Sequence, residues 1–256
     1  MAFSHAPAGD ARDFHFISLP NRDVERQPMH VPNVMHVTLP NLRWFTFNGG
    51  SAYMEAVVRR VTAPRLKKLR FNFLRQLTFS IPRLIQFLST IENFRFDSAK
   101  VRFLGERVYA ELYSREEAEM SLVLNVYCWH LDWQVSSVAQ IFNALNQIFS
   151  TVEHLTLEHE AHSRSSEERN EVDRTEWHEL LRSCSNVKTL SVEDGLVGQL
   201  SRSLRLDDEE LPLDLLPELQ ELTCSGSGDV GDAFTSFIDA RQKASLPVTL
   251  VHPSPG

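Results

Sequence analysis

The segment LRWFTF at residues 42–47 places apolar side chains at its first, fourth and sixth positions, which are Leu42, Phe45 and Phe47. Alternation at the last two of these positions is typical of a half-buried β-strand, because successive side chains of a strand point to opposite faces. Five further segments have the same spacing: LKKLRF (66–71), IENFRF (91–96), VEHLTL (152–157), VKTLSV (187–192) and LQELTC (219–224). The sequence therefore predicts a repeated strand.

The six segments begin 24, 25, 61, 35 and 32 residues apart. The longest interval contains the alternating run LVLNVYC at residues 122–128, which we expect to be an intermediate strand. VPNVMHVTL (31–39) and PVTLVH (247–252) are candidate strands at the two ends of the sheet. The intervals are of the length expected when one supersecondary unit is repeated along a chain.

Helical patterns lie between the strands. Within residues 136–149, apolar side chains recur at i, i+3, i+4, i+7, i+10 and i+11, and Ser136 or Ser137 is the expected N-cap. Start signals predict four more helices, at Ser51, Pro82, Thr175 and Asp232.

A strand followed by a helix, repeated in this way, buries its apolar face only when neighbouring units stack. The predicted fold class is therefore α/β: a leucine-rich-repeat-like solenoid with a parallel sheet on one face and helices on the other, the six segments being neighbouring strands in chain order. The Asn or Cys that usually follows such a strand is replaced here, for example by Gly50 and Glu160, so we expect an irregular solenoid. The predicted divisions are an N-terminal extension that is partly disordered or capping (1–32), the solenoid domain (33–252) and a tail (253–256).

Composition bounds the class of protein. Hydrophobic residues make up 42% of the chain, and no apolar run approaches the roughly 18 residues of a membrane span. The first residues lack the pattern of a signal peptide. Cys128, Cys184 and Cys224 are odd in number and scattered, which indicates reduced thiols and predicts the cytosol or the nucleus.

Charge is divided along the chain. Residues 41–110 carry 13 Lys and Arg against 4 Asp and Glu, whereas residues 111–240 carry 8 against 26. This division is read either as the solvated faces of helices or as two surfaces that attract different partners. On the strand face opposite the core, the candidate partner-binding residues are Trp44, Lys68, Arg70, Arg95, His154, Glu158, Glu193 and Glu221. Trp44 is the one large aromatic residue among them. The alternative interpretation is that the N-terminal segment covers Trp44, which would then not be available to a partner.

Motifs for catalysis or cofactors are weak. His159-Glu160-Ala161-His162 has an i, i+3 spacing, whereas a zinc-protease helix needs i, i+4, so we expect no metal site. GSGDVG (226–231) resembles a phosphate-binding turn but contains no lysine, and a flexible turn is the preferred interpretation. We therefore expect no catalytic residues, no cofactor and no enzymatic activity.

Several blocks resemble a known family: LPNLRWFTFNGGSAYMEAV, APRLKKLRFNF, LDWQVSSVAQIF, STVEHLTLEH and FIDARQKASLPVTLV. They are similar to the C-terminal region of F-box-like proteins from basidiomycete fungi, over roughly residues 33–252. The resemblance implies degenerate leucine-rich repeats that recognise substrates of a ubiquitin ligase. Residues 1–32 are too few for an F-box, so we expect either a fragment or a copy without adaptor binding, and a ligase adaptor as partner only if an F-box lies upstream.

The expected function is binding of a protein partner, with an acidic segment meeting the basic end of the strand face and with no membrane contact. The alternative is a nucleic-acid-binding or scaffold protein that uses the basic N-terminal half, where Lys67, Lys68, Arg70 and Arg75 near Phe73 could contact phosphates. A pI near 5.7 and the acidic second half disfavour that alternative.

Overall fold

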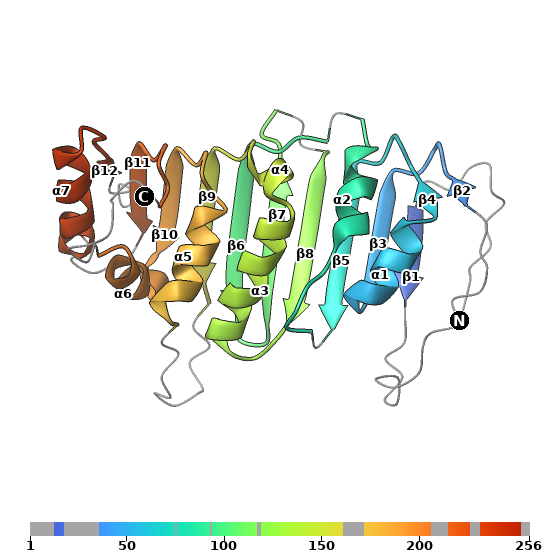
Figure 1. Ribbon diagram of the computed structural model, residues 1–256, viewed down its shortest axis with the longest axis horizontal. Helices are drawn as coiled ribbons and strands as arrows, with labels where there is room; N and C mark the ends of the chain where they lie inside the picture. Colours follow the sequence, from blue (N-terminus) through green and yellow to red (C-terminus); the bar gives the residue numbers. More distant parts are fainter. Residues whose placement is uncertain are drawn as a thin grey trace.

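The computed structural model describes residues 13–17, 36–74, 76–92, 94–116, 119–160, 172–205, 215–225 and 231–251. These residues form an α/β fold in which a ten-stranded, mostly parallel sheet carries the helices on one face (Figure 1). Among them, no helix combines the length and the apolar character that crossing a membrane requires.

The large sheet has the strand order β1-β3-β5-β8-β7-β6-β9-β10-β11-β12. Its strands are β1 (Asp13–Ile17), β3 (Trp44–Gly49), β5 (Lys68–Leu74), β6 (Ser98–Leu104), β7 (Arg107–Tyr113), β8 (Ser121–Tyr127), β9 (His154–His159), β10 (Thr189–Glu193), β11 (Glu221–Ser225) and β12 (Thr249–Val251). Neighbours pair in parallel, except that β7 is antiparallel to both β6 and β8.

Five of the six repeated segments are confirmed as strands of this sheet: they supply β3, β5, β9, β10 and β11. The run at 122–128 is confirmed as β8, and PVTLVH supplies the end strand β12. VPNVMHVTL does not join the large sheet, because its β2 (Val37–Thr38) pairs with β4 (Val61–Thr62) in a separate two-stranded sheet. The strand at the other end is β1, from the predicted N-terminal extension, and it pairs in parallel with β3.

The prediction was wrong for IENFRF. Ile91 and Phe96 are buried as predicted, but this segment is a turn and connection in which the Glu92 N–H donates to the Pro64 carbonyl at 3.1 Å. The strand begins at Ser98 instead, and it continues through a tight turn into the antiparallel β7. The five confirmed strands keep their chain order in the sheet, but they are not all neighbours, because β8, β7 and β6 lie between β5 and β9 in the reverse of their own chain order.

The helices are α1 (Ser51–Val58), α2 (Pro82–Ser89), α3 (Leu131–Ala144), α4 (Asn146–Phe149), α5 (Arg174–Arg182), α6 (Asp194–Ser203) and α7 (Thr235–Lys243), with a 3-10 turn, η2 (Gly231–Phe234). The start at Pro82 is confirmed. The cap of the long helix was placed six or seven residues too late, because the N-cap of α3 is His130. The cap of α5 is Asp173, whose carboxylate accepts the Thr175 N–H at 2.8 Å, so the cap was placed two residues too late.

The core lies between the sheet and the helices. One row of side chains in register runs through Phe45, Leu69, Leu122, Leu112, Ala99, Leu155, Leu190 and Leu222, and all of them are buried. A second row, two residues further along each strand, includes Phe47, Phe71 and Leu157, which are also buried. The alternation of apolar and polar residues along each strand therefore places the apolar side chains on the face that the helices cover.

Candidate partner-binding surface

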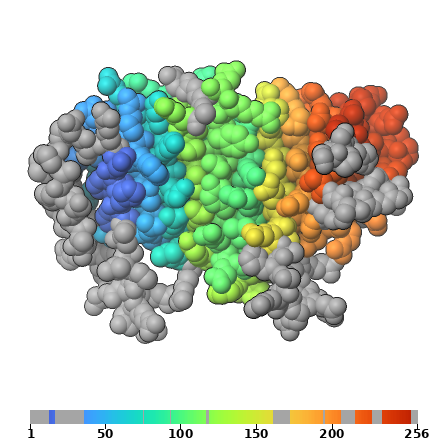
Figure 2. All heavy atoms as spheres, turned by 180° about the vertical axis from the view of Figure 1, so that it is seen from behind, coloured from blue at the N-terminus to red at the C-terminus, as the bar shows by residue number. Residues whose placement is uncertain are grey.

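The face of the sheet opposite the helices carries the other half of the strand side chains; we call it the open face (Figure 2). In β5 the burial alternates residue by residue along KLRFNFL, and Lys68 and Arg70 are exposed while Leu69 and Phe71 are buried. Register aligns Trp44 with Lys68 and Thr46 with Arg70. The open face is therefore made of rows that cross the strands.

The N-terminal end of the open face carries an exposed aromatic ring between a lysine and a histidine. Trp44 is 39% exposed, and the Lys68 ammonium lies 6.0 Å from the centroid of its ring. His15 of β1 lies on the other side, with its ring centroid 6.2 Å from that of Trp44. Among the described residues, neither Lys68 nor Arg70 forms a salt bridge. These two cations are available to an external anion.

A row of amides crosses the next part of the face. The Asn125 amide donates to the side-chain oxygen of Asn72 at 2.6 Å, and the Asn72 amide donates in turn to Asn48. The same row continues to Tyr109, whose ring lies 4.5 Å from the Arg102 guanidinium. Since these polar groups bond to each other across strands, they stabilise the face and leave little for a ligand.

The candidate carboxylates at the C-terminal end are engaged within the protein. Glu158 forms a salt bridge of 2.7 Å with Lys100. Glu193 accepts the His159 N–H at 2.9 Å, and Glu221 accepts the Thr223 hydroxyl at 3.4 Å. In contrast to Lys68 and Arg70, these groups already have partners, so the basic end is the better candidate for binding.

Two of the predicted site residues differ from expectation in their setting. Arg95 is exposed but lies in the connection before β6, since IENFRF is not a strand, so it is not part of the strand rows of the open face. His154 lies on the face and its Nδ1 is 2.6 Å from the Thr189 hydroxyl. Burial, followed by the nearby Arg115, lowers the pKa of His154, which disfavours a positive charge on this ring.

No group of three potential metal ligands occurs among the described residues. His159 is among them, whereas His162, GSGDVG up to residue 230 and the acidic run 207–210 lie outside the described residues. The expectation of no metal site stays a prediction.

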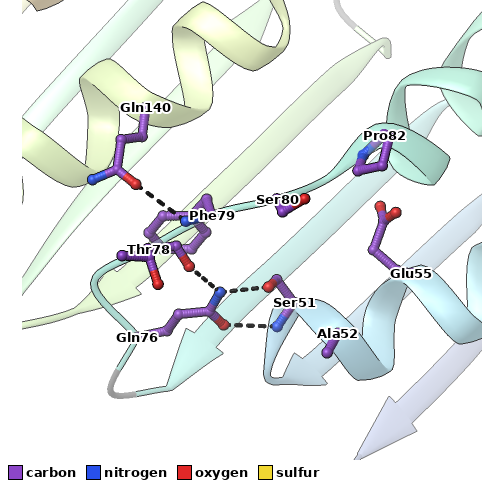
Figure 3. A pocket seen from close by; sticks show the side chains of 9 residues that line it. All are labelled: Ser51, Ala52, Glu55, Gln76, Thr78, Phe79, Ser80, Pro82 and Gln140. Atoms are coloured by element: carbon purple, nitrogen blue, oxygen red, sulfur yellow. Dashed lines mark hydrogen bonds between the residues drawn. The ribbon is translucent and has the colours of Figure 1, made fainter.

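A polar hollow of about 550 Å³ lies on the helix side, between the start of α1 and the connection from β5 to α2 (Figure 3). Gln76 spans it: its side chain accepts the Ser51 N–H at 2.7 Å and donates to the Ser51 hydroxyl. The Glu55 carboxylate accepts the N–H groups of Arg83 and Leu84 at 2.7 and 2.8 Å, so it caps α2 from the neighbouring helix. These polar groups are used to join the helices.

The three thiols are all buried. Burial, the main cause, raises the pKa of Cys128 and Cys224 to about 11 and that of Cys184 to about 12. At pH 7.5 the folded protein should therefore react with a thiol reagent such as 5,5′-dithiobis(2-nitrobenzoate) many times more slowly than the same protein in guanidinium chloride. The measurement is the absorbance released over time. Rapid release of one equivalent under native conditions would identify an accessible thiolate.

Comparisons with protein-family models, curated proteins and solved structures found no match to this chain. The described residues form an α/β fold whose mostly parallel sheet carries the described helices on one face.

Proposed function

We propose that this protein is a binding module whose open face recognises an acidic segment of another protein. The observation that carries the proposal is the set of Trp44, Lys68 and Arg70: an exposed ring beside two cations with no salt bridge among the described residues. Exposed Trp and Arg are enriched among residues that contribute most to protein interfaces. Cations on the rim of such a surface mainly accelerate association with an acidic partner.

We also propose the finer reading, a leucine-rich-repeat-like solenoid that serves as the substrate-recognition part of an F-box-type receptor in the cytosol or the nucleus. Strand and helix units repeated in register, with the helices on one face, support it. The inserted β6 and β7 are the departure from a regular solenoid. Whether the reading frame continues upstream into an F-box, and whether that longer protein binds the ligase adaptor, are the tests.

The binding site is tested with peptides selected from a random library on the full chain. We expect the selected peptides to be rich in Asp and Glu. Reversal of charge in Lys68→Glu/Arg70→Glu should slow their association about tenfold at low salt, with less effect at high salt. Trp44→Ala should mainly speed dissociation, about fivefold or more. Surface plasmon resonance measures both rates.

The matched control is Arg59→Glu/Arg83→Glu, which makes the same change in charge on two exposed arginines of the helix-covered side. If this variant loses binding while the open-face variants keep it, the helix side is the binding surface. A labelled single-stranded oligonucleotide is titrated in parallel. Tighter binding of that oligonucleotide than of the acidic peptides would favour the nucleic-acid alternative.

A further inference from the structure

A second exposed aromatic cluster lies beyond the opposite ends of the strands, where β5, β6 and β8 end. It encloses a hollow of about 470 Å³ lined by Leu77, Glu106, Tyr127, Cys128, Trp129 and Trp133; we call it the aromatic hollow. Trp44 and Lys68 begin β3 and β5, whereas Tyr127 ends β8. With about 3.3 Å per residue along a strand, the two sites are on the order of 20 Å apart.

The rings of the aromatic hollow are unusually open to solvent. Trp129 is 68% exposed, and Trp133 and Leu77 are each 43% exposed. Together they are half of the six large hydrophobic residues that are exposed in the described part of the chain. Apolar groups concentrated in one exposed place indicate a site of contact with another molecule.

The walls of the hollow are held in place from α3. The buried amide of Gln134 donates to the carbonyls of Leu104 and Cys128 at 2.7 and 2.9 Å, which joins the end of β6 to the end of β8. The Gln140 amide donates to the Leu77 carbonyl at 3.0 Å, which fixes the third connection. Because the connections after β5, β6 and β8 are all hydrogen-bonded to α3, little conformational entropy is lost when a ligand binds in the hollow.

The charge beside the rings favours a cation. The Glu106 carboxylate lines the hollow and forms no salt bridge among the described residues. Asp132 is close enough for its charge to act on the Cys128 thiol. In the described part of the chain, one cation opposes these two carboxylates, the Arg107 guanidinium, which lies 5.9 Å from the centroid of the Tyr127 ring, so the acidic groups beside the rings outnumber it. Aromatic faces combined with an unpaired carboxylate form the arrangement that binds organic ammonium groups.

We propose that the aromatic hollow binds the methylated ammonium group of a lysine side chain in a partner protein. Methylation keeps the positive charge that Glu106 and the rings attract, while it replaces strongly hydrated N–H groups with methyl groups that fit an apolar lining. Leu77, at the edge of the hollow, offers apolar surface to the methylene stem of the lysine. This site is separate from the open face, so neither proposal depends on the other.

The test is an NMR titration of the full chain, following the indole N–H signals of Trp129 and Trp133. The probes are three acetylated Ala-Lys-Ala amides that differ in one side chain: trimethyl-lysine, lysine, and the neutral isostere in which a tert-butyl group replaces trimethylammonium. We expect the trimethyl-lysine peptide to bind about tenfold more tightly than either of the others. Equal binding of the neutral isostere would show a merely hydrophobic site and overturn the proposal.

Choline and its neutral isostere 3,3-dimethylbutan-1-ol are titrated in parallel. Choline that binds as tightly as the trimethyl-lysine peptide would replace the lysine by a free or lipid-borne headgroup, and so overturn the commitment to a protein partner. No shift at either indole with any of the cations would overturn the site itself.

Variants assign the interaction to named groups. Glu106→Gln should weaken the trimethyl-lysine peptide about two- to fivefold and leave the neutral isostere unchanged. Trp133→Leu should weaken the cation about tenfold. Trp44→Leu removes an exposed tryptophan at the other end of the strands and is the matched control, with no expected change. Equal losses in Trp44→Leu and Trp133→Leu, or none in Trp133→Leu with an unchanged thermal transition, would contradict the assignment.

Discussion

Arg241→Met is expected to lower the free energy of unfolding by about 3 to 5 kcal/mol. The Arg241 side chain is 1% exposed, and its guanidinium donates to the carbonyls of Leu216, Pro217 and Leu219 at 3.0 to 3.1 Å. A weaker bond reaches the Leu246 carbonyl at 3.4 Å. Methionine preserves much of the apolar stem but removes the side-chain donors of all three carbonyls, of which Leu216 alone keeps a described donor, the Leu219 N–H at 3.0 Å. Urea denaturation followed by circular dichroism measures the change.

The bonds of Arg241 join α7 to the turn before β11 and to the connection before β12. Lys243→Met is the matched control, because Lys243 is exposed in the same helix. Its effect should stay within about 0.5 kcal/mol. If Arg241→Met were as stable as Lys243→Met, the guanidinium would not be what holds this end of the sheet together.

The strands could be predicted where alternation and repetition agreed. In VEHLTL and VKTLSV, the apolar residues Leu155 and Leu190 lie on the face that the helices cover. The polar residues that alternate with the apolar ones in each strand lie on the open face. IENFRF has the same spacing, but it follows α2 directly and its apolar residues pack as a connection. A three-point apolar pattern does not distinguish a strand from a loop that packs on the core.

The β6–β7 hairpin had a signal of its own. SAKVRFL and RVYAELY both alternate, and Gly105-Glu106 between them is a two-residue connection that contains glycine. The prediction of a uniform parallel repeat took precedence over this local pattern. The spacing of apolar residues alone therefore does not decide whether this part of the chain forms another parallel repeat or an antiparallel hairpin.

Capping rules alone did not predict correctly where every helix begins. Ser136 and Ser137 are acceptable caps, yet the cap of α3 is His130, six or seven residues earlier, because Leu131 and Val135 add a buried turn to the same stripe. Helix α6 was not predicted. Its glycines, Gly195 and Gly198, reduce helix propensity, while packing of the rest of the helix overrides that cost.

The candidate site could be predicted in part. Strand alternation put Trp44, Lys68 and Arg70 on the open face, and they lie there. The internal partners of Glu158 and Glu193 depend on pairing of β6, β9 and β10, which the sequence does not state. The exposure of Trp129 depends on three connections meeting at one edge, and from sequence a tryptophan near a helix start is usually assigned to the core.

Leu190→Ala is expected to lower the free energy of unfolding by about 2 to 5 kcal/mol. Leu190 is 1% exposed in β10, which has a strand on either side, and its register partners are Leu155 and Leu222, which are buried as well. Removing the isobutyl group leaves a cavity that β-strands on both sides cannot easily close. The measurement is a urea titration of the purified full chain.

Ser191→Ala is the matched control for Leu190→Ala, one residue along the same strand. Ser191 is in register with Thr156 and Thr223 on the open face, where no helix covers it. Its replacement should change the free energy of unfolding by no more than about 0.5 kcal/mol, because little volume is lost from the core. Similar losses for both variants would mean that the two faces of β10 are equally buried. The open face would then not exist at this strand, and the binding model would lose its geometric basis.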